Sequence, residues 1–304
     1  MGITVCISSI RATTIGETIT AIQQQDFVEW ELFVVAQGTD PELRKAVEKA
    51  AESDPRIHCI PMTEFGLSRG RNAGIAAANY EIIAITDDDC APAPNWLSVI
   101  DDYFSREPEL GLLAGSLVAP PAERSGISTC PATTVPEAIF DPETMQKCPE
   151  SFCIVGANMA LRKSAWLQVG AFEAEVGAGT SLPSSEDIEY AIRMEKCRIK
   201  MRCTPQSRVV HTYGRRYGWK AVIGLGQSYA QGQGAIAAKM TLGGSPDGAK
   251  WRRSMRKQCL IEPLRSLRLQ RVPNGIVRWF AFRSGYDRCL QRFQIDEQGM
   301  LQKK

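Results

Sequence analysis

Long apolar runs and paired cysteines are both missing from this chain of 304 residues. No stretch approaches the roughly 18 consecutive apolar residues of a membrane-spanning helix. The chain does not open with the charged and then apolar segment of a secretion signal, because Ile3 to Ile7 is typical of a first strand. Ten cysteines are scattered without a Cys-x-x-Cys pair, which argues against a structural zinc or a disulfide framework. Free thiols throughout favour a cytoplasmic location.

Histidine and net charge are also scarce, but the charge is unevenly distributed. The only histidines are His58 and His211, and the formal net charge is +2. Residues 250–304 hold 14 Lys and Arg against 4 Asp and Glu, hence +10, while residues 1–249 hold 22 against 30, hence −8. A basic tail on an acidic body suggests an anionic surface as partner. Nucleic acid is not expected, because the body is acidic and no nucleic-acid motif is present.

Strand-like and helix-like patterns alternate along the first hundred residues. Strands are predicted at 3–8, 31–36, 57–60 and 81–86, and helices at 15–25, 41–53 and 68–79. This alternation predicts parallel β-α-β units with right-handed crossovers. Beyond them we expect helices at 95–104, 163–169 and 186–197, strands at 110–118, 152–161 and 199–203, and a long loop over 119–150.

The basic tail carries two apolar stripes at near-helical spacing. Pro263 is expected to break or kink the first, which consists of Trp251, Met255, Leu260, Leu264 and Leu267. The second is more regular and consists of Trp279, Phe282, Tyr286, Leu290 and Phe293, interleaved with Arg278, Arg283, Arg288 and Arg292. Such a stripe either packs in the core or against a second subunit, as in a homodimer, or forms an amphipathic surface that touches anionic lipid at the inner face of a membrane.

Three consecutive aspartates, Asp87, Asp88 and Asp89, follow an apolar run over residues 81–86. The run predicts a buried strand of a parallel sheet, where an unpaired carboxylate would be costly. The triplet is therefore expected at the carboxyl end of the strand, where open α/β sheets bind ligands. Repulsion among the carboxylates calls for a cation, and hard divalent ions commonly bridge to a substrate's phosphates. The alternative is a solvated acidic turn.

Further motifs accompany the triplet in a fixed order. They are Gly66 to Gly74, Gly156 to Ala160, Gly170 to Phe172, Ser185 to Asp187, and His211. With the triplet, over about residues 3–213, this set resembles the family-two glycosyltransferases of the GT-A fold. The resemblance implies an α/β fold with a Rossmann-like, mostly parallel sheet flanked by helices, followed in this chain by a helical basic appendage. It also implies an inverting, metal-dependent transfer from a nucleotide sugar.

The resemblance suggests which residues hold the metal. The triplet matches the family's D-x-D motif, with Asp89 as the expected metal ligand, Asp87 as a further candidate, and Asp87 or Asp88 directed toward the nucleotide's ribose. His211 would complete the site, and an imidazole among oxygen ligands suits Mn²⁺ better than Mg²⁺. Taken without the resemblance, His211 is more simply a core histidine with satisfied hydrogen bonds.

The resemblance places the nucleotide base near the ends of the first two strands. The first strand ends with Ser8, Ile10 and Arg11, and many members of the family have other residues at these positions. The second strand ends at Gln37, with Asp40 three residues later, and one of these would substitute for an aspartate that usually contacts the base. These differences from the usual family residues put the identity of the nucleotide in doubt more than the fold.

Two residues at the start of the third helix are expected to hold the diphosphate. Arg69 and Asn72, together with backbone N–H groups at the helix start, offer donors to an anion. The alternative is a surface arginine and a helix-capping asparagine.

The resemblance places a catalytic base at the start of the helix predicted over 186–197. Asp187, with Glu186 second, would take the proton from an acceptor hydroxyl. The alternative is a capping role, because the helix dipole favours a carboxylate at that position. The preceding stretch from Gly177 to Thr180 would flex as a closing loop or form an ordinary turn.

We expect three segments: a nucleotide-sugar-binding half at 1–115, an acceptor-binding and catalytic half at 116–215, and a helical extension at 216–304. The expected reaction moves one sugar from a nucleoside-diphosphate sugar, with UDP favoured, to a saccharide or lipid-linked acceptor in polysaccharide or glycoconjugate synthesis. The first rival is a sugar-nucleotide nucleotidyltransferase, although the Gly-rich basic loop of such enzymes is missing after the first strand. The second is a catalytically degenerate scaffold that binds a sugar nucleotide or a partner.

Overall fold

The computed structural model describes residues 1–265 and 272–304, and the chain divides into two compact units. Unit 1 comprises Met1–Ser125, Cys130–Phe172 and Tyr190–Arg215. Unit 2 comprises Gly126–Thr129, Glu173–Glu189 and Arg216–Lys304. The segment 173–189 thus belongs to the same unit as the C-terminal helices. Leu267, in the first predicted stripe, lies outside the described residues.

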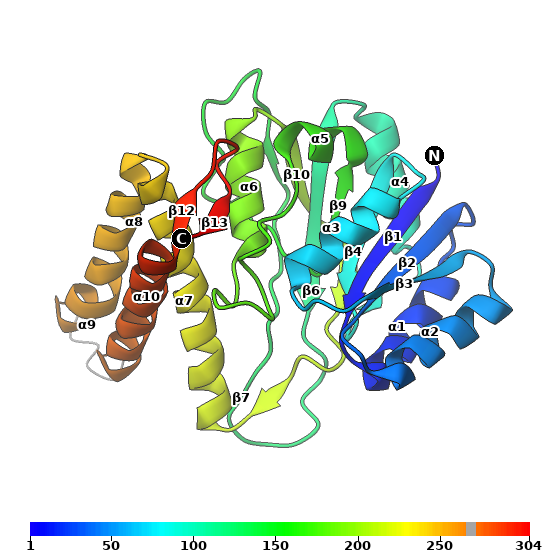
Figure 1. The fold of residues 1–304 in the computed structure, drawn as a ribbon, viewed down its shortest axis with the longest axis horizontal. Helices are drawn as coiled ribbons and strands as arrows, with labels where there is room; N and C mark the ends of the chain where they lie inside the picture. The colour runs from blue at the N-terminus through cyan, green and yellow to red at the C-terminus, as the bar shows by residue number, and fades with distance from the viewer. Residues whose placement is uncertain (266–271) are drawn as a thin grey trace. The chain divides into compact units, whose positions relative to one another are not determined.

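A nine-stranded sheet forms the centre of unit 1 (Figure 1). Its strands are β1 (Ile3–Ser9), β2 (Trp30–Gln37), β3 (Ile57–Met62), β4 (Ile82–Asp87), β5 (Ala91–Pro92), β6 (Leu110–Val118), β8 (Ala138–Phe140), β9 (Met159–Arg162) and β10 (Lys200–Val210). They lie in the order β3-β2-β1-β4-β9-β6-β10-β5, with β8 paired to β10. The four strands from β3 to β4 are parallel, and β9 is antiparallel to both of its neighbours.

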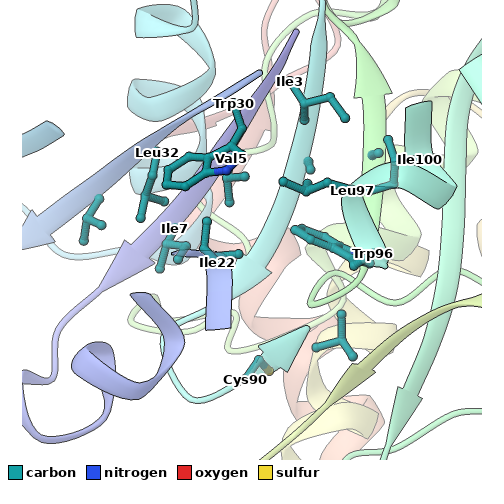
Figure 2. Close-up of a cluster of buried hydrophobic side chains, with 14 of the residues drawn as sticks. Ile3, Val5, Ile7, Ile22, Trp30, Leu32, Cys90, Trp96, Leu97 and Ile100 are labelled. Atoms are coloured by element: carbon teal, nitrogen blue, oxygen red, sulfur yellow. The ribbon is translucent and has the colours of Figure 1, made fainter. Parts of the chain in front are cut away.

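Side-chain alternation along the strands divides the core of unit 1 into two clusters. Ile3, Val5 and Ile7 of β1 belong to one cluster, whereas Cys6 belongs to the other. Figure 2 shows the first cluster, in which Trp96 and Leu97 pack near the strand residues. The helices of this unit are α1 (Ala12–Gln23), α2 (Pro41–Ser53), α3 (Leu67–Ala77), α4 (Trp96–Arg106), α5 (Lys163–Val169) and the larger part of α6 (Glu186–Lys196). Because both faces are covered, the central strands are largely apolar, as the sequence predicts.

Two strand predictions in the second half of the sheet have wrong limits. The strand expected at 152–161 begins only at Met159, because Asn158 is buried and its side chain bonds to the carbonyls of Ser116 and Ser207 at 2.8 and 3.1 Å. The strand expected at 199–203 continues to Val210. A register shift after Thr204 accommodates the polar residues that end the apolar pattern.

Unit 2 is mostly helical. Its elements are β7 (Ser128–Thr129), β11 (Arg216–Tyr217), α7 (Trp219–Leu242), α8 (Pro246–Arg256), the π-helix η1 (Lys257–Ile261), α9 (Glu262–Arg265), α10 (Val272–Arg292), β12 (Phe293–Ile295) and β13 (Leu301–Lys303). Strands β12 and β13 form a hairpin. Within the described residues, no helix combines the length and apolar character needed to cross a membrane.

Three of the five residues of the second aromatic stripe lie in the core of unit 2. Phe282, Tyr286 and Phe293 are at most 5% exposed, and the rings of Phe282 and Tyr286 stack with centroids 6.4 Å apart. The hydroxyl of Tyr286 lies 3.1 Å from that of Thr241 on α7. Of the two alternatives for the stripe, packing in the core therefore holds for these three residues, whose apolar area is already removed from water.

Close approach between α7 and α10 depends on glycine. A Cβ added at Gly234 would overlap the carbonyl oxygen of Phe282, whereas one added at Gly226 meets nothing within 4 Å. We predict that Gly234→Ala destabilises the protein by about 1–3 kcal/mol through overpacking. The matched Gly226→Ala, in the same helix, should stabilise it by about 0.5–1 kcal/mol. Urea denaturation measures both, and equal effects of the two substitutions would contradict the packing shown.

Candidate functional site

Polar side chains gather where β1 and β4 end, at the carboxyl edge of the sheet in unit 1. Asp88 is 3% exposed and accepts a hydrogen bond from the hydroxyl of Ser9 at 2.7 Å. The backbone N–H of Ile10 lies 3.4 Å from the same carboxylate, while the Ile10 side chain is exposed. The parallel register of β1 and β4, with Ser8 opposite Asp87, brings these residues together.

Arg11 places a guanidinium against two carboxylates of the triplet. It donates to both oxygens of Asp88 and, at 2.9 Å, to Oδ2 of Asp89. Burial opposes its charge, but the bonds and charges of the two aspartates outweigh burial and raise the pKa of Arg11. Burial raises the pKa of Asp88, although Arg11 and Ser9 partly oppose this. Arg11 thus compensates the acidic site and keeps its half-exposed side chain at the surface.

Asp89 and His211 face each other at the end of β10. Oδ1 of Asp89 lies 3.3 Å from Nε2 of His211, and both residues are buried. The other ring nitrogen, Nδ1, lies 2.9 Å from the carbonyl oxygen of Pro131. That carbonyl can only accept, so Nδ1 carries a proton, and a neutral imidazole would then direct the lone pair of Nε2 at the carboxylate. Two lone pairs face to face need a proton or a metal ion between them.

The pKa values of this pair follow from their contact. Burial alone would raise the pKa of Asp89, but the hydrogen bond and charge of His211, with help from Arg11, lower it. Burial alone would lower the pKa of His211, but Asp89 outweighs this and raises it above the ordinary 6.5. The contact therefore favours the ionised form of Asp89 and the protonated form of His211.

The residues at this position fit a divalent cation. Ligand atoms of Asp89, Cys90 and His211 lie within 4.8 Å of one another. The bond from His211 to Pro131 is the kind of outer contact that orients a metal-binding imidazole. Sequence reasoning missed Cys90, although it directly follows the triplet. Burial and the neighbouring aspartates raise the pKa of its thiol well above the ordinary value, and its side chain belongs to the apolar core cluster, so Asp89 and His211 are the stronger candidate ligands.

Asp87 lies outside this group of three. Its Oδ1 accepts a bond from the buried guanidinium of Arg71 at 3.0 Å, and Arg71 also bonds to the carbonyl of Gly156 at the same distance. Sequence reasoning gave Arg71 no role, although it stands within the Gly66–Gly74 motif. Ser9 was likewise missed beside Ser8.

The two residues expected to contact the base are engaged within the protein. Gln37 donates to the hydroxyl of Ser8 at 3.1 Å and to the carbonyl of Gly66 at 2.8 Å, and it accepts from the N–H of Gly66 at 3.0 Å. Asp40 caps α2 by accepting from the N–H of Glu42 at 3.0 Å. Gln37 therefore fixes the start of α3, and its base contact stays a prediction.

Arg69 and Asn72 lie on α3 but differ in their surroundings. Arg69 donates to the carbonyl of Phe65 at 3.2 Å. Asn72 makes two hydrogen bonds to the backbone of Phe172, donating at 2.9 Å and accepting at 2.8 Å. A diphosphate contact from Asn72 would have to replace these bonds, so the structure gives Asn72 a role in fixing the chain at Phe172.

Glu186 and Asp187 begin α6 and belong to unit 2. Glu186 is buried, and Oδ1 of Asp187 accepts from the N–H of Ile188 at 2.8 Å. Ser185, just before the helix, has a φ of 75°, which is unusual for a residue other than glycine and common near functional sites. The preceding turn is closed by the hydroxyl of Thr180, which donates to the carbonyl of Gly177 at 2.9 Å.

The strand order, the acidic edge and the flanking helices define a GT-A fold. Residues 4–169, more than half of the chain, match glycosyl transferase family 2. The chain belongs to this family.

The chain resembles individual proteins at low sequence identity. A glucosyl-dolichyl phosphate glucuronosyltransferase of Haloferax volcanii is 22% identical over 247 residues, 76% of each chain. The mannosyltransferase PcManGT of Pyrobaculum calidifontis, solved with GDP-Man and Mn²⁺, is 18% identical with a TM-score of 0.60, covering 93% of this chain and 75% of that one. S. aureus TarS 1–349 with UDP is 13% identical with a TM-score of 0.53, covering 100% and 96%. This chain covers only 40% of the longer TarS chain, with a TM-score of 0.56 and 14% identity over 79% of its own length.

The raised pKa of His211 predicts how metal binding depends on pH. This pKa lies above 6.5, and below it a metal ion must displace the proton on Nε2. Mn²⁺ affinity should therefore fall by about tenfold for each unit by which the pH is lowered further. Calorimetry with Mn²⁺ and a nucleoside diphosphate over a pH series measures this slope. His211→Gln should weaken binding and flatten the slope, whereas His58→Gln should leave both unchanged. An unaltered slope in His211→Gln would remove His211 from the metal site.

Proposed function

We propose that this protein transfers one sugar from a nucleoside-diphosphate sugar to an acceptor hydroxyl, with inversion and with the help of a divalent cation. The observation that carries the proposal is the pair of Asp89 and His211 at the carboxyl edge of the sheet, with Nδ1 of His211 held by the carbonyl of Pro131. Within a family-two GT-A fold, a carboxylate and an oriented imidazole at this edge could coordinate a divalent cation that also binds the donor's diphosphate.

The residues around the triplet have different proposed roles in donor binding. Asp89 and His211 would hold the cation, which supplies charge stabilisation for the departing nucleoside diphosphate. Arg11 holds Asp88 and Asp89 in place, and its half-exposed guanidinium adds positive charge at the same edge. Mn²⁺ is the proposed ion, because one ligand is an imidazole and because PcManGT was solved with Mn²⁺.

The proposed base is Asp187, with Glu186 as the second candidate. A carboxylate that takes the acceptor's proton as the oxygen attacks the anomeric carbon gives a single displacement, and a single displacement inverts that carbon. Oδ1 of Asp187 accepts the backbone N–H of Ile188, and this bond holds the carboxylate at the start of α6.

Donor and acceptor are proposed by class. UDP is the favoured nucleotide, in line with the TarS complex, and GDP is the alternative, in line with PcManGT. A saccharide on a lipid phosphate is the favoured acceptor, because the Haloferax relative is described as acting on glucosyl-dolichyl phosphate. Such an acceptor would place the reaction at the cytoplasmic surface of a membrane.

A donor panel tests the proposal. We expect nucleoside diphosphate release from one UDP- or GDP-sugar, greatly increased by Mn²⁺ and by an acceptor, and abolished in Asp89→Asn. Asp101→Asn is the matched control, because it removes a partly exposed carboxylate of unit 1 from its ion pair with the amino terminus. Pyrophosphate consumption or release would instead favour a nucleotidyltransferase. Donor binding without release for any acceptor would favour a degenerate scaffold.

Replacing the base should affect turnover rather than donor binding. Asp187→Asn keeps the shape and the hydrogen bond to Ile188 but loses the basic oxygen, so kcat should fall by roughly 10²–10⁴-fold. The Kd for donor and metal should barely change. If turnover survives in Asp187→Asn and is lost in Glu186→Gln, the two roles are exchanged.

A further inference from the structure

A buried lysine of unit 2 joins the two ends of the segment that leads to the proposed base. Nζ of Lys239, on α7, lies 2.6 Å from Oε2 of Glu173 and 2.7 Å from Oε1 of Glu189. Glu173 begins the segment Glu173–Glu189, and Glu189 ends it in the first turn of α6. All three side chains are more than nine-tenths buried. One ammonium therefore closes this segment into a loop.

Other contacts within unit 2 tie the same segment to the C-terminal elements. The N–H of Leu301, on β13, donates to Oε2 of Glu173 at 2.8 Å. Arg288, on α10, donates to the carbonyl of Ser181 at 2.7 Å. Ser184 donates to the carbonyl of Ser228, on α7, at 2.9 Å. The C-terminal extension therefore supports the segment along its length.

The chemistry of the cluster favours positioning over simple stability. Burying two carboxylates and one ammonium is costly, and apolar residues of similar volume often stabilise a fold equally well. Ion pairs at short distance do fix geometry, because each carboxylate must point at the same nitrogen. Glu189 lies two residues after Asp187 in the first turn of α6, so fixing Glu189 also fixes the start of that helix.

We propose that Lys239 is a positioning residue, which holds the segment Glu173–Glu189 so that the carboxylates at the start of α6 keep one orientation toward the acceptor. This rests on the proposed function for its catalytic consequence. The C-terminal extension, with α7, α10 and the β12–β13 hairpin, is then part of the acceptor-side machinery. It is not an appendage that can be removed without effect.

Hydrogen exchange tests the positioning directly and needs no substrate. In Lys239→Met, the amides of Val176, Gly177 and Leu182, which are hydrogen-bonded within the loop, should exchange faster than in the wild type. Amides in the middle of α2, in unit 1, serve as the internal reference. Lys250→Met is the matched control, because it removes an exposed lysine of the same unit from its pair with Asp247. Unchanged exchange in the loop would overturn the proposal.

Kinetics separates positioning from stability. In Lys239→Met, kcat should fall by on the order of 10²-fold, as expected for a misplaced catalytic group, while the Kd for Mn²⁺ and nucleoside diphosphate stays unchanged. The triple variant Lys239→Met, Glu173→Gln, Glu189→Gln removes every charge of the cluster and should recover the wild-type Tm, yet keep the fast exchange and low kcat. Recovery of kcat together with Tm would show that the cluster only stabilises the fold.

The two proposals fail in different ways. A wild-type protein without transferase activity would contradict the proposed function, while loop exchange would still decide whether Lys239 holds the segment. Should Lys239→Met not fold, the triple variant gives the same exchange and kinetic comparison.

Discussion

Three neighbouring carboxylates at the end of one strand can coexist only because each has its own basic partner. Asp87 pairs with Arg71 from α3, Asp88 with Arg11 from the end of β1, and Asp89 with His211 from the end of β10. The partners come from three different elements, which all have to meet at the carboxyl edge of the sheet. The order of the strands and the placing of α3 are thus coupled to the charge balance of the site.

The three pairs are not equivalent. Arg71 is almost fully buried and permanently charged, so its pair with Asp87 is a fixed part of the structure. Arg11 is half-exposed and spans two aspartates. His211 is the only partner of the three that can lose its charge near neutral pH. Asp89 is consequently the carboxylate whose partner could change from a cation to a neutral ligand for the proposed metal ion, which agrees with its choice as the proposed metal-binding member of the triplet.

The sequence predicted local features well and long-range contacts poorly. The limits of α2, α5 and β6 follow from apolar periodicity and capping residues, and the structure has them where the sequence places them. The placing of the triplet at a strand end followed from the cost of burying charge. The contacts of Asp87 with Arg71 and of Asp88 with Ser9 could not be predicted from the sequence. The partners are 16 and 79 positions apart, and the periodicity of apolar residues carries no information about such contacts. The aromatic stripe of α10 showed one buried face, but not whether a helix or a lipid surface covers it.

Gln37, where the family resemblance leads one to expect an aspartate that contacts the base, makes structural hydrogen bonds instead. An amide has both a donor and an acceptor, so Gln37 can bond to the N–H and the carbonyl of Gly66 at once, which an ionised aspartate cannot do. Both ends of the Gln37 side chain are then used, and Asp40 caps α2. If these bonds persist with donor bound, the amide of Gln37 would be occupied, and Asp40 would have its second carboxylate oxygen left for a base. For the proposed nucleotide-sugar donor, the bonds of Gln37 direct attention to the other groups at this edge of the sheet as candidates for contacting the base.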